Sequence, residues 1–348
     1  MNPYKSLDKN SFWKSGVADL HPSNILRVWD PKFIIRKRHA IACYGSCFAQ
    51  HIGKALATRG YNMLITEVPP KNMSSESASH FNYDKFSSRT GNIYTASLLR
   101  QWVEWSIDRA LVPAEVWIDN GRYYDPFRPT IEPAGFDSYD ECVRSRHYCL
   151  DCFYKSIVKS EFIVFTLGLT ESWANIDGFE YPMCPGTVAG LFDPDKHIFL
   201  NQGFSKVQDD LNFTLGLIKR HNPRVKVILT VSPVPLTATY SGSHVLKATM
   251  ASKSILRSVA GYFENSKRFV DYFPSYEIIS SPAYCGYFFE SNKRNISKAG
   301  VDHVMDVFFH DLYSKYPDLV PGVVDEKNST SEFEERCDEE LLASFGGL

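Results

Sequence analysis

The second half of the chain alternates apolar strand-like runs with amphipathic helical segments, and this alternation constrains the fold most. The periodicity predicts helices at 138–157, 205–220, 246–263 and 297–315, and strands at 162–168, 225–231 and 268–273. Strands separated by helices predict a parallel sheet covered by helices on both faces. The chain is therefore expected to have an α/β fold.

An earlier strand, at about 39–44, runs into the turn Gly45-Ser46-Cys47, and a helical segment follows it. A tight turn between a buried strand and a helix leaves backbone N–H groups unpaired, and these favour a thiolate or an alkoxide. Ser46 and Cys47 are therefore candidate nucleophiles. The alternative is a buried cysteine beside a serine that caps the helix.

In parallel sheets of this kind, ligands bind beyond the carboxyl ends of the strands. Four segments that leave predicted strands there have unusual compositions, namely 45–48, 168–173, 232–236 and 273–277. We expect these four segments to converge on one rim of the sheet.

The rest of the chain divides into three parts by composition. Residues 1–38 are polar and aromatic and are expected to wrap the surface of a single domain at 39–320. That domain contains a loop-rich insertion at about 61–137, in which only 96–109 looks helical. Residues 321–348 form an acidic tail, which we expect to be a solvated, partly helical extension.

Charge and hydropathy exclude several functional classes. The chain has 38 basic and 40 acidic side chains, so no overall field attracts nucleic acid or an anionic membrane. No apolar run is long enough to cross a bilayer and no targeting segment is evident, so we expect a cytoplasmic protein without membrane insertion.

Eight cysteines are scattered along the chain, which indicates free thiols rather than a disulfide framework. Cys149 and Cys152 have the spacing of a metal or redox pair. However, they share one helical face with Cys142 and Phe153, and no second such pair completes a tetrahedral site. We therefore expect these cysteines to pack in the core, and we expect no metal site.

The turn and its flank, Gly45-Ser46-Cys47-Phe48-Ala49, resemble the signature of the GSCFA domain family, a bacterial group related to the SGNH (GDSL-like) hydrolases. Segments 91–95, 165–171, 232–235 and 272–277 also resemble that family, and the resemblance covers about 40–310. It implies a three-layer α/β/α fold with a mostly parallel, flavodoxin-like sheet.

The resemblance also implies roles for individual residues. It places Cys47 at the SGNH nucleophile position, with Ser46 as the alternative if the turn is shifted by one residue. Segment 168–171 corresponds to the oxyanion block, in which Thr170 replaces the usual Asn and Gly168 and Glu171 flank it. A threonine hydroxyl can donate one hydrogen bond to an oxyanion. Gly91 and Asn92 are candidates for the other donors, with a plain turn as the alternative.

The usual Asp-x-x-His block is missing, because Asn292 and Asn295 occupy its register and neither can act as a base. His244, in the loop at 232–245, is the candidate base, and either Glu277 or Glu171 is the candidate to orient it.

Two further residues are weaker candidates. His303 is a second possible base, but at 100° per residue it points away from the apolar face of its helix, which predicts a solvated side chain. Arg128 is a candidate to bind an anionic group of the substrate.

These residues support two hypotheses of different classes. The first is an acyl-transfer enzyme, an esterase or an O-acetyltransferase, that acts on a carbohydrate or polysaccharide precursor through Cys47 or Ser46. It needs no bound cofactor, and acetyl-CoA is a candidate acyl donor. The second is a non-catalytic glycan-binding or biosynthetic accessory protein, which the missing Asp-x-x-His block favours.

Overall fold

The computed structural model describes residues 2–319 and 337–346 and forms two compact units. One unit comprises Met1–Arg36 with Phe273–Phe333, and the other comprises Lys37–Tyr272 with Glu334–Leu348. The candidate nucleophiles lie in the second, larger unit.

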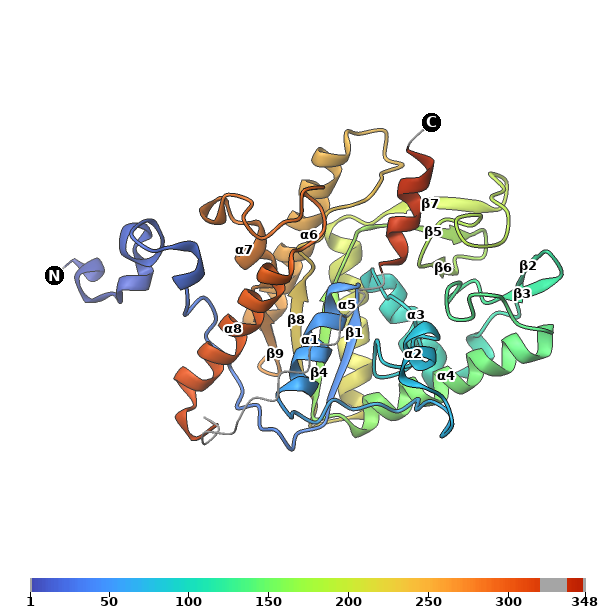
Figure 1. Cartoon of the computed structure of the whole chain (residues 1–348), viewed down its shortest axis with the longest axis horizontal. Helices are drawn as coiled ribbons and strands as arrows, with labels where there is room; N and C mark the ends of the chain where they lie inside the picture. The colour runs from blue at the N-terminus through green and yellow to red at the C-terminus, as the bar shows by residue number, and fades with distance from the viewer. Residues whose placement is uncertain (1, 320–336, 347–348) are drawn as a thin grey trace. The chain divides into compact units, whose positions relative to one another are not determined.

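The predicted parallel sheet is confirmed. Its strands, in spatial order, are β1 (Ile41–Gly45), β4 (Phe162–Leu167), β8 (Lys226–Val231) and β9 (Val270–Phe273), and all of them are parallel (Figure 1). Met63 forms an isolated parallel bridge to Ile41 of β1. Because β4 takes the other edge of β1, this bridge stands where a second strand stands in the flavodoxin-like order 2-1-3-4-5.

Helices cover both faces of this sheet. Alternate side chains of β1, β4 and β8 meet α3 (Ala96–Ile107), α4 (Tyr139–Lys159) and α5 (Phe204–His221), with Tyr44, Phe165 and Leu229 facing Leu99, Phe153 and Leu215. Cys43 points to the opposite face, where a Cβ on Gly53 of α1 (Phe48–Thr58) would lie 3.7 Å from its Cβ. α6 (Val245–Ser266) packs on β8 and α5. The three-layer α/β/α prediction is therefore correct.

The helices and strands predicted from periodicity agree with the structure to within a few residues, but between β4 and α5, where the periodicity predicts neither helix nor strand, the structure has further strands. That segment forms an antiparallel sheet of β6 (Glu180–Tyr181), β5 (Glu171–Asn175) and β7 (His197–Asn201). The insertion also contains α2 (Ser75–His80), the 3₁₀ turn Arg109–Leu111 and a hairpin of β2 (Trp117–Asp119) and β3 (Arg122–Tyr124). These strands are short and half-exposed, so their apolar pattern is weak.

The cysteine prediction is confirmed. Cys142, Cys149 and Cys152 are buried on one face of α4, and all eight cysteines are free thiols.

The smaller unit joins short N-terminal turns (Pro3–Ser6, Lys9–Ser11, Lys14–Ala18 and Pro22–Asn24) to α7 (Ser275–Ser280), Pro282–Tyr284, α8 (Lys298–Lys315) and Pro317–Leu319. The carboxylate of Asp311 on α8 accepts hydrogen bonds from the backbone N–H groups of Arg27 and Trp29, at 2.8 and 2.9 Å. The Trp29 ring stacks on Phe308 with 4.8 Å between centroids. These contacts fix the N-terminal segment to α8.

His303 on α8 contradicts the prediction of a solvated side chain. It is buried, and its ring stacks on Phe288 with centroids 4.8 Å apart. The pKa of this imidazole is lowered, because the effect of burial outweighs the opposite effect of Asp306. The helical-face argument fails because α8 also buries residues outside its predicted apolar face, including Gly300, Val307 and Asp311, which lie on the same side of the helix as His303.

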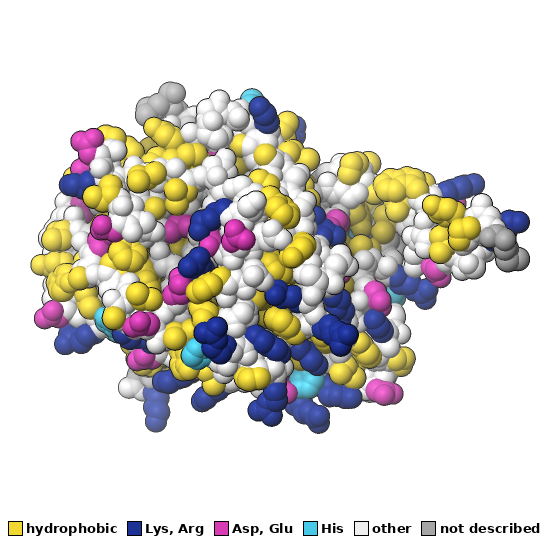
Figure 2. Space-filling view, turned by 180° about the vertical axis from the view of Figure 1, so that it is seen from behind, with side chains coloured by type: hydrophobic (Ala, Val, Ile, Leu, Met, Phe, Trp, Pro, Cys, Tyr) yellow, Lys and Arg dark blue, Asp and Glu magenta, His cyan; other side chains and the backbone are white. Residues whose placement is uncertain are grey.

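Basic side chains concentrate in one region. Figure 2 shows Lys and Arg gathered over the lower part of the face in view. α4 ends in Lys159, and the last turn of α5 carries Lys219, Arg220 and His221. Cations at a helix C-terminus interact favourably with the helix dipole, which accounts for these positions.

Within 2–319 and 337–346, no helix is long and apolar enough to span a membrane.

Candidate functional site

The turn between β1 and α1 is fixed by the close approach of β4. Gly45 has φ +132°, and a Cβ on it would lie 2.4 Å from the backbone oxygen of Thr166. The N–H of Ser46 donates to that same oxygen at 3.0 Å. Only glycine fits this position, because the backbone conformation and the neighbouring strand both exclude a side chain.

Both candidate nucleophiles lie on this turn, and each is only 2% exposed. Cys47 is the residue immediately before α1, and its side chain makes no capping hydrogen bond. The hydroxyl of Ser46 has no hydrogen-bond partner among the described residues. Ser46 is therefore not a helix cap, and its hydroxyl is a buried polar group without an evident structural role.

Two further segments converge on the turn, as expected from the carboxyl ends of β1 and β4. The N–H of Ile93 donates to the carbonyl of Gly45 at 2.9 Å, and the N–H of Gly168 donates to the carbonyl of Tyr94 at 2.8 Å. A Cβ on Gly168 would lie 3.0 Å from the Cβ of Ser46 and 3.1 Å from the Tyr94 ring. Glycine at 168 therefore lets the two loops close around Ser46.

Thr170 is held by α6 and β7. Its N–H donates to the Ser252 hydroxyl at 3.1 Å, and its own hydroxyl donates to the side-chain oxygen of Asn201 at 3.0 Å. The hydroxyl proton of Thr170 is therefore already engaged. In this conformation Thr170 positions the loop rather than offering a donor to a ligand.

α6 contributes Ser252 and Lys253 to these loops, and neither was predicted as a site residue. Lys253 is buried, and its ammonium donates to the carbonyl of Gly168 at 2.7 Å, next to the Thr170–Ser252 bond. The available signal was spacing, because Lys253 falls on the buried stripe that runs from Thr249 to Leu256. A lysine on such a stripe indicates a specific polar partner.

The C-terminal segment contradicts the expectation of a solvated tail at 337–339, whereas 340–346 are mostly exposed and the 3₁₀ helix Asp338–Phe345 agrees with a partly helical segment. Asp338 and Glu339 are 5% and 7% exposed. The Asn92 amide donates to the Asp338 carboxylate at 2.6 Å, and the backbone N–H of Thr237 donates to the Glu339 carboxylate at 2.7 Å. Burial of these acids is compensated by these donors. Residues 321–336 and 347–348 of the expected tail lie outside the described residues.

Groups from several of these segments act electrostatically on the phenol of Tyr94. Burial raises the pKa of its phenol well above the usual value, and Cys337, Asp338, Cys47 and Glu339 raise it further. The phenol is therefore neutral at physiological pH. Its hydroxyl has no hydrogen-bond partner within the described part of the chain.

Arg128 is buried in a network of ion pairs and is not available to a substrate. Its guanidinium donates to the Asp125 carboxylate at 2.8 Å, to the Arg89 carbonyl at 3.3 Å and to the Ser145 hydroxyl at 3.1 Å. The anion-binding role expected for Arg128 is therefore dropped. Its physical role is to hold the backbone that leads into Gly91 and Asn92.

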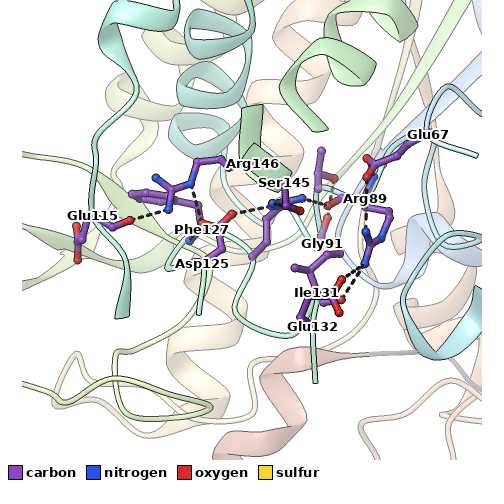
Figure 3. Close-up of polar contacts among 12 residues, drawn as sticks. Glu67, Arg89, Gly91, Glu115, Asp125, Phe127, Ile131, Glu132, Ser145 and Arg146 are labelled. Atoms are coloured by element: carbon purple, nitrogen blue, oxygen red, sulfur yellow. Dashed lines mark hydrogen bonds and ion pairs between the residues drawn. The ribbon is translucent and has the colours of Figure 1, made fainter. Parts of the chain in front are cut away.

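The same network fixes Arg89, two residues before Gly91. Its N–H donates to the Glu67 carboxylate at 2.8 Å, and its guanidinium donates to the Ile131 carbonyl at 3.0 Å and to Glu132 at 2.8 Å (Figure 3). Gly91 has φ +68°, which a glycine adopts without strain. The loop that carries Asn92 is thus anchored from its N-terminal side.

His244 caps α6, whereas Glu171 bonds to the loop after β8. Nδ1 of His244 accepts the N–H of Leu246 at 3.2 Å, so the ring caps α6 and its proton is on Nε2. The Glu171 carboxylate accepts from the Thr239 hydroxyl at 2.7 Å and from the Tyr240 N–H at 3.4 Å. Among the described residues, no hydrogen bond joins His244 to Glu171, Ser46 or Cys47.

Glu277 on α7 and His303 on α8 belong to the smaller unit.

Glu180 on β6 is a buried carboxyl beside these loops. Burial raises its pKa to about 7, although the hydrogen bond from Thr95 and the nearby Ser172 hydroxyl lower it. Its side chain also accepts from the amide of Gln202, at 3.3 Å. A carboxyl whose pKa is raised on folding stabilises the folded state below its unfolded pKa, and this contribution is lost as the pH rises through 7.

Glu180→Gln should therefore become progressively more stable than the wild type as the pH rises from 4.5 to 8. The expected change in the difference between their free energies of unfolding is about 2–3 kcal/mol. Urea denaturation followed by tryptophan fluorescence at several pH values measures this difference. A difference that does not change with pH would contradict the raised pKa of Glu180.

Comparisons with known proteins follow this geometry. The profile of the GSCFA family matches residues 40–308, which include every segment that meets at the GSC turn except the C-terminal one. The chain belongs to the GSCFA family.

Among the described residues, no group of three or more His, Cys, Asp or Glu is placed to hold a metal ion.

No curated protein sequence matches this GSCFA chain. Among solved structures, it is similar to the periplasmic domain of a lipopolysaccharide acetyltransferase from Salmonella ser. Paratyphi A. The identity is 14%, the match covers 76% of this chain and 96% of that one, and the TM-score is 0.29.

Proposed function

We propose that this GSCFA protein is an acyl-transfer enzyme, an esterase or an O-acetyltransferase, with Cys47 as its nucleophile and a hydroxyl-bearing carbohydrate as its substrate. One observation supports it above the others: several candidate residues converge on loops at the carboxyl ends of β1 and β4. They are Ser46, Cys47, Asn92, Tyr94 and Gly168. Parallel sheets bind their ligands at this edge.

In the proposed reaction, the Cys47 thiolate attacks the acyl carbon, and a thioester forms as the alcohol or thiol of the donor leaves. Water or a sugar hydroxyl then attacks the thioester and restores the thiol. The start of α1 favours the thiolate, and the Asn92 amide and the backbone of Gly91 are the proposed oxyanion donors. For a transferase, acetyl-CoA is the proposed donor.

His244 remains the proposed proton carrier, although its present tautomer limits it. With Nδ1 accepting from Leu246, the ring can donate a proton but cannot accept one at Nε2. Its use as a base requires that the capping bond break. Ser46 is the alternative nucleophile, supported by its buried hydroxyl without a partner.

Active-site labelling tests the nucleophile. An acyl-donor analogue, applied to the wild type, Cys47→Ala and Ser46→Ala, should lose its label in Cys47→Ala alone, whereas a fluorophosphonate, which reacts with activated serines, should label Ser46 only if Ser46 is the nucleophile. Cys43→Ala is the matched control, because burial raises the pKa of that thiol to about 12 and keeps it protonated. Equal labelling in Cys47→Ala and the wild type would reject Cys47, and loss only in Ser46→Ala would assign the role to Ser46.

A non-catalytic glycan-binding protein is the second candidate. It is supported by the asparagines at 292 and 295, where SGNH enzymes place their acid and base. Calorimetric binding of an oligosaccharide, without label at Cys47 or Ser46 and without acyl release, would favour this candidate.

A further inference from the structure

The segment Cys337–Phe345 is held by its acids rather than by its apolar side chains. Leu341 and Phe345 remain 45% and 60% exposed, whereas Asp338 and Glu339 are almost fully buried. Each buried carboxylate receives a hydrogen bond from the larger unit, from the Asn92 amide and the Thr237 N–H. A short segment with little apolar burial is bound weakly and is released when its polar anchors are lost.

With Asp338 in this position, the proposed acyl-transfer reaction cannot proceed. Asn92 is the proposed oxyanion donor, and a carboxylate oxygen lies 2.6 Å from its amide nitrogen, the distance expected for a charge-assisted hydrogen bond. A carboxylate at this donor stands where the oxyanion, or the carboxylate of a hydrolysed acyl group, would bind. The N–H of Asn92 that faces Asp338 cannot donate to both at once.

The C-terminal segment also closes the surroundings of the thiol. Cys47, Cys337, Asp338 and Glu339 all act on the same buried phenol, that of Tyr94. A small polar cavity lined by Gln50, Gly91, Asn92 and Asp338 lies beside them. Asn92 and Asp338 therefore share one buried cavity, and the phenol of Tyr94 links both acids electrostatically to Cys47.

We propose that Cys337–Phe345 (red in Figure 1) is an inhibitory segment, which occupies the acyl-transfer site as an internal carboxylate ligand and must leave before an acyl donor can bind. The inhibitory role rests on the proposed function, but the occupancy does not. The covered and open states are in equilibrium, and the two charge-assisted hydrogen bonds favour the covered state.

The test uses the full chain and the rate at which iodoacetamide alkylates Cys47, measured by peptide mass spectrometry. Asp338→Ala/Glu339→Ala should raise this rate at least about ten-fold, since each bond to a charged group is worth about a factor of ten. Glu340→Ala, the exposed neighbouring acid, is the matched control and should leave the rate unchanged. Cys43 and Cys149, both buried in the core, should stay protected in all variants.

Equal alkylation rates for Cys47 in the double variant and the control would overturn the proposal. If Cys43 and Cys149 also react, the variant has unfolded, and Asp338→Asn/Glu339→Gln is then judged by the same criteria. Faster alkylation with reduced acyl transfer would also overturn it, because the acids would then serve the reaction. Faster alkylation without any acyl-enzyme label would reject the proposed function and leave the covering of Cys47 by this segment established.

Discussion

Gly45→Ala is expected to lower the free energy of unfolding by about 4 kcal/mol, which sums a backbone strain and a steric contribution. A Cβ at this position would lie 2.4 Å from the Thr166 oxygen and 2.6 Å from the Thr166 nitrogen. Both atoms belong to β4 within the sheet, so they cannot move without breaking hydrogen bonds to β8. The φ of +132° adds strain for any residue with a side chain.

Gly91→Ala is the matched control for this prediction. Gly91 also has positive φ, +68°, but a Cβ there would meet no atom within 4 Å. The control should therefore lose only the backbone contribution, about 1–2 kcal/mol. Urea denaturation followed by circular dichroism compares the two variants, and equal losses would show that β4 does not constrain the turn.

The fold was predictable where side chains repeat with a clear period. The buried strands β4 and β8 are continuous apolar runs, and α4, α5 and α6 carry an apolar stripe, so their bounds agree with the sequence analysis. β5 alternates half-exposed and buried residues over five positions, and β6 has only two residues. Patterns this short do not differ from those of a loop.

The candidate site was predictable where it depends on one contiguous segment. The strand, turn and helix around Gly45 are encoded locally. The bond from Asn92 to Asp338 joins residues 246 positions apart, and the contact of Lys253 with Gly168 spans 85. No local pattern specifies such pairs. The burial of His303 likewise depends on Phe288, which contacts its ring from outside the helix.

Arg128 illustrates the same limit. Its side chain is a plausible anion ligand in the sequence, but its partner Asp125 also binds Arg146, which arrives from α4 with 3.0 Å between its Nε and the carboxylate. Burial alone would raise the pKa of Asp125, yet Arg146 and Arg128 outweigh burial and hold this pKa below its usual value. The carboxylate is therefore charged at neutral pH and pairs with two buried cations.

Asp125→Ala should consequently destabilise the protein by about 4 kcal/mol, because it leaves two buried guanidinium groups without their shared anion. The Arg146 guanidinium keeps the carbonyls of Pro113 and Glu115, at 2.6 Å each, but these neutral acceptors do not balance its charge. Asp137→Ala is the control, since Asp137 is an exposed acid paired with Arg122, and it should change stability by less than about 1 kcal/mol.

The effect of Asp125→Ala should also depend on pH in a defined direction. A carboxyl whose pKa is lowered on folding stabilises the folded state above its unfolded pKa, and this contribution is lost as the pH falls through the folded pKa. The stability difference between the wild type and Asp125→Ala should therefore be constant from pH 7 to about 5 and shrink below about pH 4. Urea denaturation at each pH measures it. A gap that stays constant from pH 5 down to the lowest pH at which the protein folds would mean that the aspartate acts through its shape and hydrogen bonds alone, whereas a gap that shrinks below about pH 4 would show that its charge fixes Arg128, the Arg89 carbonyl and the loop of Asn92.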